Sequence, residues 1–264
     1  MPRPPGTAHA MQTDLRRRLG VAIGMLIAMA LPVAAAPGCS RMDHDGQGYV
    51  ICEVPAAQEP ALRLWQDGPD GRVLGNFSAV RRMLAPDEAL AFAMNAGMFH
   101  PDFRPVGLLV IDGQERQPLV TGASDGNFGM LPNGVFCAGG DRPFRVIESR
   151  AYARARPDCR IATQSGPMLV IDGRLHPRFL VDSDSRYVRN GVGVSPDGQT
   201  AWFAISDRPV TFHEFGRLFR DGLGVRDALY FDGSISRLHA PALGRSDFGR
   251  SLGPIIGMVG RTAP

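Results

Sequence analysis

Hydrophobic and polar positions follow one another in a readable order between residues 189 and 236. Short apolar runs at 191–194 and 200–205 flank a polar segment, a pattern typical of two antiparallel strands joined by a turn. Apolar residues then recur every three or four positions from 212 to 219, which predicts a helix with one apolar face. A further apolar run at 228–231 predicts a short buried strand.

The predicted helix has recognisable signals at both ends. Thr211 and Glu214 have the spacing of a capping box, in which a hydroxyl and a carboxylate satisfy amides of the first turn. Gly222 and Gly224 can adopt the left-handed backbone that ends many helices. The order strand, helix, strand predicts a right-handed crossover that leaves its two strands parallel.

Charged residues fall at one edge of this predicted sheet. Parallel strands carry their carboxyl ends to the same edge, so Asp207 and Asp232 are expected there. The hairpin brings Arg189, which precedes its first strand, to the same edge. An arginine between two aspartates is a candidate oxyanion site with acid or base groups beside it. A structural ion pair with two turn aspartates is the alternative interpretation.

Other apolar runs predict the remaining elements. Residues 48–54 and 61–65 suit strands, and 89–94 is a continuous apolar run fit for a central strand. Residues 79–84 predict a short helix, and 254–259 predicts a last strand that closes the sheet edge. Together they predict an α+β fold: a single domain with a mixed, largely antiparallel sheet, one strand–helix–strand crossover and flanking helices.

A short fragment, Leu-Val-Ile-Asp-Gly, occurs at 109–113 and again at 169–173. Each copy predicts a strand that ends in an Asp-Gly hairpin turn, so Asp112 and Asp172 are assigned to turns and not to chemistry. Residues 128–136 predict another hairpin around a Pro-Asn turn.

The start of the chain has the order of a secretory signal: three arginines at 16–18, then an apolar stretch that ends in alanines. We expect residues 1–36 to be removed and residues 37–264 to form a periplasmic or secreted domain without membrane association. An uncleaved membrane anchor is the alternative, because the apolar run approaches the ~18 residues that span a bilayer. Pro32 and the alanine-rich end favour cleavage.

Composition narrows the function further. The net charge is only +3 and the arginines are scattered, which gives no support to nucleic-acid binding. In an oxidising compartment, four cysteines without metal or redox spacing are expected to form disulfides. Proximity in the sequence suggests one pairing, although three are possible; it joins Cys39 with Cys52 and Cys137 with Cys159.

Metal and cofactor chemistry has little support. His213 and Glu214 begin like a zinc-protease helix, but Arg217 stands where the second ligand would be. His213 is therefore either an exposed first-turn residue or one that lines the site. No phosphate loop or dinucleotide fingerprint is present, so no cofactor is expected. A calcium ion among Asp207, Asp232 and backbone carbonyls stays an open alternative.

Two further polar segments adjoin predicted buried strands. Asn95 opens a segment that can bring backbone amides near a ligand or can simply form a tight turn. Ser165 precedes a Gly-Pro pair and a strand, and is either a hydroxyl that contacts a ligand or a turn cap. The strand-to-helix elbow that usually activates a nucleophilic serine is not evident.

Five segments together resemble the phosphodiester glycosidase family, in order and approximate spacing. They are Asn-Ala-Gly-Met-Phe at 95–99, Ser-Gly-Pro at 165–167, Arg-Asn-Gly-Val-Gly at 189–193, Asp207, and Leu-Tyr-Phe-Asp-Gly-Ser-Ile-Ser at 229–236. The resemblance is to a bacterial secreted branch of the family. Its last motif typically reads Asp-Gly-Gly-Gly-Ser, so two glycines are missing here, which leaves less room for backbone amides to approach a phosphate.

The resemblance implies hydrolysis of a sugar C1–O bond whose leaving group is a phosphodiester. Arg189 would grip phosphate oxygens, Asp232 would act as nucleophile or base, and Asp207 would be its partner or general acid. Groups expected to contact the sugar or phosphate are Asn95, Gly97, Ser165, Gly166, Asn190, Gly233, Ser234, Ser236 and His213.

The expected substrate is a sugar-1-phosphodiester in an envelope glycan, an exopolysaccharide or a glycoconjugate. The alternative is a non-catalytic protein that binds glycans or phosphoglycans in the same cleft. A phosphodiesterase that cuts the P–O bond is a third hypothesis, and it would ordinarily need metal ligands.

Overall fold

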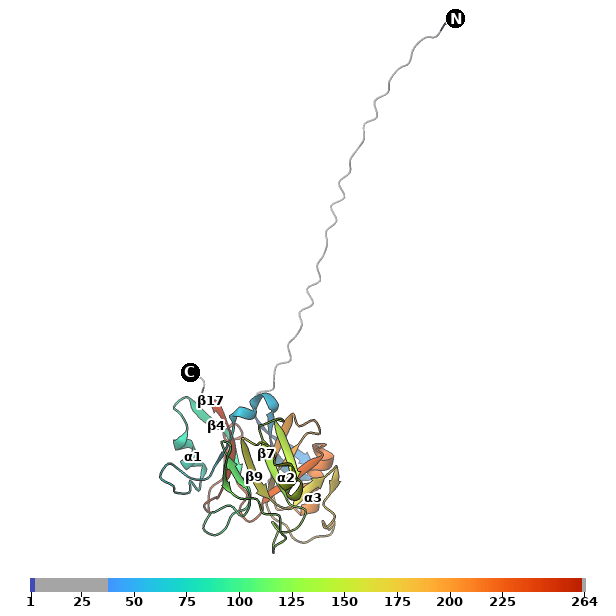
Figure 1. Cartoon of the computed structure of the whole chain (residues 1–264). Coiled ribbons are helices and arrows are strands. Elements are labelled where there is room, and N and C mark those ends of the chain that lie inside the picture. The colour runs from blue at the N-terminus through green and yellow to red at the C-terminus, as the bar shows by residue number, and fades with distance from the viewer. Residues whose placement is uncertain (3–37, 263–264) are drawn as a thin grey trace. The chain divides into compact units, whose positions relative to one another are not determined.

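The computed structural model describes residues 1–2 and 38–262, so the expected signal segment 1–36 lies almost entirely outside the described residues (Figure 1). The chain divides into two units, Met1–Ala35 and Ala36–Pro264, and the fold described below is that of the second unit.

Three antiparallel sheets build this unit. The first has the order β1 (Cys39–His44), β2 (Gln47–Pro55), β13 (Thr200–Ser206), β12 (Asn190–Val194), β14 (Asp227–Asp232), β10 (Met168–Ile171) and β11 (Arg174–Leu175). The second has the order β16 (Arg245–Ser246), β15 (Leu238–Ala240), β4 (Glu88–Asn95), β17 (Ile255–Arg261) and β3 (Leu62–Trp65). The third has the order β6 (Gln114–Gln117), β5 (Leu109–Ile111), β9 (Ile161–Ser165), β7 (Gly134–Ala138) and β8 (Phe144–Glu148).

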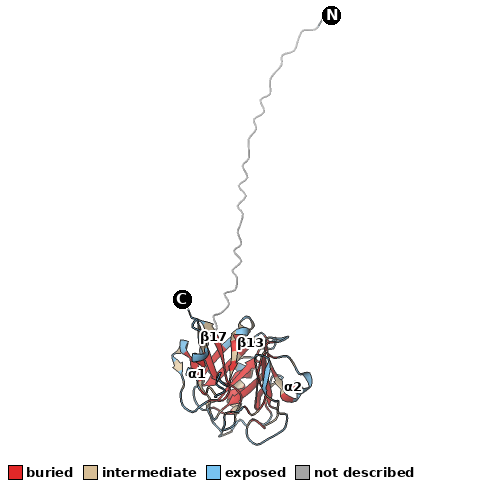
Figure 2. Ribbon diagram, turned by 60° about the vertical axis from the view of Figure 1, so that its left-hand side comes forward, coloured by how far each residue is buried: buried red, intermediate tan, exposed pale blue. Residues whose placement is uncertain are grey.

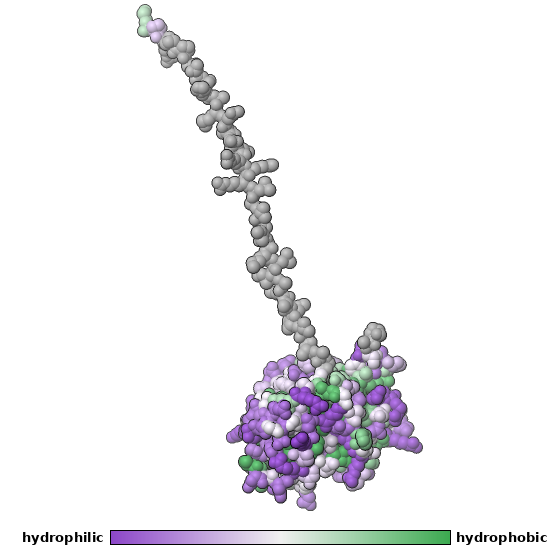
Figure 3. Space-filling model, turned by 180° about the vertical axis from the view of Figure 1, so that it is seen from behind, coloured by the Kyte–Doolittle hydropathy of each residue, from purple (hydrophilic) through white to green (hydrophobic). Residues whose placement is uncertain are grey.

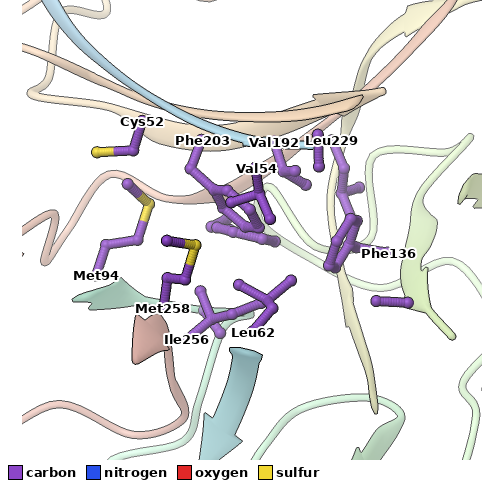
Figure 4. Close-up of a cluster of buried hydrophobic side chains, with 14 of the residues drawn as sticks. Cys52, Val54, Leu62, Met94, Phe136, Val192, Phe203, Leu229, Ile256 and Met258 are labelled. Atoms are coloured by element: carbon purple, nitrogen blue, oxygen red, sulfur yellow. The ribbon is translucent and has the colours of Figure 1, made fainter. Parts of the chain in front are cut away.

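The inner faces of all three sheets share one hydrophobic core. Figure 4 shows Phe203 and Leu229 of the first sheet converging with Met94 and Ile256 of the second and with Phe136 of the third. All five side chains are fully buried. In Figure 2 the buried residues follow the strands and the exposed ones follow the turns and outer helices. This common core holds the three sheets, and hence their strand ends, in fixed relation.

A short helix covers the outer face of each sheet. α3 (Phe212–Arg217), continued by η2 (Leu218–Gly222), packs its aromatic residues on the first sheet. α1 (Phe77–Met83) covers β4 and β17 of the second sheet, and α2 (Ser149–Ala155) lies on the third. Two 3-10 turns, η1 (Ala56–Ala61) and η3 (Pro241–Leu243), connect strands. The content and arrangement are those of an α+β fold, as predicted.

The local predictions around α3 are confirmed. β13 and β14 are parallel, because both pair antiparallel to β12, which lies between them. The Thr211 hydroxyl accepts from the Glu214 amide at 3.1 Å while the Glu214 carboxylate accepts from the Thr211 amide at 2.8 Å, which completes the capping box. Asp112 and Asp172 occupy the expected hairpin turns, with φ of 50° and 48°.

Three predictions about the sheets are wrong. There are three sheets and not one, because the long-range strand pairings were not readable from periodicity. β17 does not close an edge, since it pairs with both β3 and β4. Residues 128–131 form no strand, so the predicted hairpin at 128–136 reduces to β7 alone.

Both expected disulfides are present. Cys39 on β1 is bonded to Cys52, its partner on β2, and Cys137 on β7 is bonded to Cys159 just before β9. Each bond therefore ties neighbouring strands. Across the described residues, no helix has the length and apolar character needed to cross a membrane. The face of the molecule in Figure 3 is largely hydrophilic, with small scattered apolar spots.

Candidate active site

Strands from all three sheets meet at one rim of the unit. β4 ends there at Asn95, β9 ends at Ser165, and β12 begins at Asn190 opposite Asp232, the last residue of β14. These four residues come from four of the five segments that carry the family resemblance. The folding of three separate sheets thus brings distant parts of the sequence to one place.

Two buried asparagines join the second sheet to the first. The Nδ2 of Asn190 donates to the backbone carbonyl of Asn95 at 2.8 Å, and the Nδ2 of Asn95 donates to Oδ1 of Asn190 at 3.2 Å. Oδ1 of Asn190 also accepts from the Asp232 amide at 3.3 Å and from the Ser236 hydroxyl at 3.1 Å. Oδ1 of Asn95 accepts from the amide of Arg237 at 2.9 Å. This network fixes the backbone on both sides of Asp232.

Ser165 joins the third sheet to the same place. Its hydroxyl donates to the Phe231 carbonyl at 2.7 Å and accepts from the Met98 amide at 3.4 Å, and the residue is fully buried. The hydroxyl thus uses its proton in one contact and an oxygen lone pair in the other. The geometry therefore favours a positioning hydroxyl over a nucleophile.

The glycines of the two upstream motifs are needed for close backbone approach. The amide of Gly97 donates to Oγ1 of Thr163 at 3.2 Å, and a Cβ at Gly97 would overlap the Gln164 carbonyl oxygen. A Cβ at Gly166 would lie 2.8 Å from the Phe128 carbonyl oxygen. Gly97 lets the end of β4 approach β9 of the third sheet, and Gly166 lets the segment after β9 approach the segment before β7; neither requires a direct role in chemistry.

Asp232 lines a cavity of about 380 Å³ at this rim. Its Oδ1 accepts from the amides of Gly233 at 2.6 Å and Ser234 at 2.8 Å, and the residue is 8% exposed. Burial raises the pKa of this carboxyl, and the amides of the following turn oppose the rise. Among the hydrogen bonds of the described residues, none is made by Oδ2, so that oxygen is available to a molecule in the cavity.

Arg189 does not lie in the cavity. Its guanidinium is fully buried on the α3 side of the first sheet, 3.7 Å from the ring centre of Phe212. Nε donates to the Val210 carbonyl at 2.8 Å, NH1 to the Tyr230 hydroxyl at 3.2 Å, and NH2 to the Ser185 carbonyl at 2.9 Å. Burial lowers the pKa of this guanidinium. This geometry does not fit the predicted binding of phosphate by Arg189, because the guanidinium is fully buried and each of its three nitrogens donates to a protein oxygen.

Asp207 is also directed elsewhere. Its carboxylate is 3.0 Å from NH1 of Arg245 and 3.7 Å from NH1 of Arg41, and it lies against Gly48 of β2. β2 flanks β13 on the side away from β14, so the carboxylate turns away from Asp232. The two aspartates share a sheet edge, as predicted, but not a pocket. This arrangement does not fit an arginine between two acids, nor a calcium ion shared by both.

The remaining residues of the last motif surround Asp232. Ser234 lines the cavity, and the hydroxyl of Ser236 donates to the Asp232 carbonyl at 2.7 Å. A Cβ at Gly233 would overlap the Tyr230 hydroxyl, so this position needs a glycine. His213 lies in the first turn of α3, half-buried, and is not among the residues that line the cavity.

Sequence reasoning missed four polar residues of the cavity wall: His100, Ser124, Asp125 and Asn127. They lie in irregular segments, which carry no periodicity. The polar, glycine-containing composition of 121–127 was the available signal, since binding residues are often carried by loops. Within residues 38–262, no group of three or more His, Cys, Asp or Glu side chains is arranged to hold a metal ion.

The fold is shared with a known protein family. Residues 88–240, more than half of the chain, match the phosphodiester glycosidase family, and the chain belongs to it. The matched segment contains Asn95, Ser165, Asn190 and Asp232, the residues that meet at the rim.

Three individual proteins resemble this chain in sequence or in fold. The chain is 28% identical over 225 residues to the uncharacterized protein YigE of Escherichia coli K12, covering 84% of this chain and 85% of YigE. Its fold is similar to the catalytic domain of zebrafish N-acetylglucosamine-1-phosphodiester alpha-N-acetylglucosaminidase, with a TM-score of 0.57 and 13% identity over 83% of this chain and 81% of that one. A hypothetical protein from Synechocystis has a TM-score of 0.53 at 13% identity, over 84% and 61% of the two chains. At these identities the structural matches concern the fold.

Proposed function

We propose that the protein hydrolyses the glycosidic C1–O bond of a sugar-1-phosphodiester, with Asp232 as the carboxylate that acts at the anomeric carbon. The observation that carries the proposal is the position of Asp232: a buried carboxylate with one oxygen held by amides and the other available, in the wall of a cavity. Family membership supplies the reaction class.

Burial of Asp232 suits either of two roles. As a nucleophile it would form a glycosyl ester that water then hydrolyses, and as a base it would deprotonate the attacking water. The amides that bind Oδ1 fix the orientation of the carboxyl group, so that Oδ2 is held in one position relative to a bound substrate. A preorganised carboxylate of this kind lowers the cost of aligning the reacting atoms.

The leaving group makes the second carboxylate less important. A phosphodiester leaves as a stable anion, so protonation by a strong general acid contributes less than in ordinary glycoside hydrolysis. With Asp207 outside the cavity, Asp125 is the other aspartate in its wall, and His100 is the group there that can carry a positive charge when protonated. We assign Asp125 as the partner carboxylate and His100 to the phosphate.

Asn95, Asn190 and Ser165 then serve the site by positioning. They hold the ends of β4, β12 and β9 against Asp232 through the hydrogen bonds described above. A secreted or periplasmic setting, with an envelope glycan, an exopolysaccharide or a glycoconjugate as substrate, is part of the proposal. The two disulfides are consistent with an oxidising compartment.

The test is release of reducing sugar from UDP-N-acetylglucosamine and from methyl phosphodiesters of several sugars. Asp232→Asn keeps the shape and the amide acceptor, and we expect a loss of at least about 10³-fold in kcat, as for removal of a catalytic carboxylate. Asp172→Asn is the matched control, because Asp172 lies in an exposed turn with φ of 48°, a conformation that asparagine tolerates. Equal activity of wild type and Asp232→Asn would refute the assignment.

Oxygen-18 water distinguishes the bond that breaks. Label in the released sugar means C–O cleavage, as proposed, whereas label in the phosphate means P–O cleavage.

One observation favours a second candidate function, a glycan-binding protein without catalysis. The two amides that bind Oδ1 of Asp232 are also the contacts that a purely structural turn carboxylate would make. Binding of the same sugars without release of product would support that second function.

A further inference from the structure

A second hollow, which we call the Trp65 groove, lies between the edge strand β3 and the hairpin β5–β6. It has a volume of about 270 Å³ and shares no lining residue with the Asp232 cavity. Its walls combine one aromatic side chain with planar polar ones: Arg63, Trp65, Gln66, Asp67, Asp112 and Arg116.

The aromatic wall is a tryptophan with part of its surface free. Trp65 packs against the apolar cluster beneath α1, stays partly exposed and is one of the residues that line the groove. A tryptophan ring offers a flat apolar surface with a polar edge, which suits a ligand that has both C–H faces and hydroxyl groups.

The polar walls carry almost no net charge. Arg63 and Arg116 are matched by Asp67 and Asp112, and Arg63 is further paired with Glu88 at 2.5 Å. Burial raises the pKa of Asp67, and the nearby Arg116 opposes this rise. Balanced, planar donors and acceptors favour a neutral polyhydroxyl ligand over a phosphate or another ion.

A buried hydrogen-bond acceptor lies in the same wall. Nε2 of Gln66 donates to the Phe103 carbonyl at 2.8 Å, which fixes the amide orientation because a carbonyl can only accept. Oε1 of Gln66 then has no partner among the described residues, although the residue is only 7% exposed. Because this oxygen is closed off from solvent, its partner would be an ordered water in the floor of the groove and not the ligand itself.

The groove is joined to the Asp232 cavity by a single loop. Phe103, held by Gln66, lies in the segment 98–106, and Met98, Phe99 and His100 of the same segment line the cavity. The backbone of this loop is closed by bonds between His100 and Arg104 and between His100 and Phe103, each 2.8 Å. The loop therefore runs from the cavity wall to Gln66, the residue next to Trp65.

We propose that the Trp65 groove is a carbohydrate subsite that binds a neutral sugar residue of the substrate glycan, away from the bond that is cleaved. That the bound sugar is part of the substrate rests on the proposed function, whereas the ability to bind a sugar rests on the residues of the groove. The enzyme would accordingly prefer oligomeric over monomeric substrates.

The chain offers a direct probe, because it contains two tryptophans, Trp65 and Trp202. In a Trp202→Phe, Asp232→Asn protein, Trp65 is the sole source of tryptophan fluorescence and no substrate is consumed. We titrate this protein with chitotriose, maltotriose and a soluble phosphomannan up to about 10 mM, the weak range typical of single sugar subsites. We expect a saturable change in fluorescence with at least one of them.

The matched comparison uses calorimetry with Trp65→Ala and Trp202→Ala, each in the Asp232→Asn background. Trp65→Ala should weaken binding about tenfold or more, and Trp202→Ala should leave it unchanged. In the active protein, Trp65→Ala should raise KM for the oligomer and leave kcat and the KM for a monomeric phosphodiester as they were.

Two results would overturn the subsite. One is the absence of any change in Trp65 fluorescence with all three saccharides. The other is binding that Trp65→Ala leaves intact, which would place the sugar in the Asp232 cavity alone. If no phosphodiester is hydrolysed but a saccharide still quenches Trp65, the proposed function fails and the subsite stands.

Discussion

Replacing Asn190 by alanine tests whether the two asparagines hold the site together. The substitution removes the donor to the Asn95 carbonyl and the acceptor for the Asp232 amide and for Nδ2 of Asn95. The Ser236 hydroxyl loses one acceptor but keeps the Asp232 carbonyl at 2.7 Å. Three buried polar groups therefore each lose a hydrogen-bond partner.

The expected cost follows from these three groups. Each buried group without a partner costs ~1–3 kcal/mol, and water from the adjoining cavity can satisfy part of the need, so we expect a total of about 2–4 kcal/mol. For a domain of this size that corresponds to a drop in Tm of roughly 5–15 °C. Because the Asp232 amide is one of the groups released, activity should fall by more than the fraction of unfolded protein explains.

Urea unfolding followed by circular dichroism measures the effect, with disulfides intact. Ser236→Ala is the graded comparison, since it removes one hydroxyl and should cost about 1 kcal/mol. The double variant should lose less than the sum of the single losses, because both residues share the Oδ1 contact of 3.1 Å. A midpoint for Asn190→Ala equal to that of wild type, or strict additivity in the double variant, would refute the reasoning.

Three further predictions concern packing, pH and the disulfides. Gly97→Ala forces a methyl group onto the Gln164 carbonyl and should lower the free energy of unfolding, measured in urea, by ~1–3 kcal/mol. An unchanged free energy of unfolding would mean that the Gly97 segment moves away from β9 at little cost. Burial raises the folded-state pKa of Asp232, so the ionised carboxylate lowers the stability of the fold at neutral pH, and this penalty disappears as the pH falls through the folded pKa. The Asp232→Asn protein should therefore be more stable than wild type by a larger margin at pH 7 than near pH 4. A stability difference that is independent of pH would contradict this. Replacing Cys137 and Cys159 by serine opens a loop with a sequence separation of 22 and should lower stability by about 3 kcal/mol in calorimetry, whereas an unchanged Tm would show that the unfolded chain gains little freedom.

Local signals in the sequence were sufficient for the elements around α3 and for the Asp-Gly turns, but not for the hairpin predicted at 128–136. The capping residues of α3, its apolar repeat and the two Asp-Gly turns each depend on a few neighbouring residues, and all are found in the structure. The parallel arrangement of β13 and β14 followed from the crossover rule alone. The shared rim of Asn190 and Asp232 could be predicted for the same reason.

The directions of the side chains at that rim could not be predicted in this way. Phe203 and Leu229 both face the common core, and counting along each strand from them puts Asp207 and Asp232 on opposite faces of the sheet. The register shift between β12 and β14 further changes how the end of β14 is presented. Division into three sheets depends on pairings between strands far apart in sequence, for which a single sequence holds no local signal.

The contacts around Asp232 span long distances along the chain. Asn95 is 95 residues from Asn190 and 142 from Arg237, and Ser165 is 66 residues from Phe231. The contacts of Asn95 with Asn190 and of Ser165 with Phe231 each join two different sheets, so the cavity exists only after the sheets have docked. Catalytic competence should consequently appear late in refolding, after most of the secondary structure, and a chain cut short at any of these strands would be inert however well its remaining parts fold.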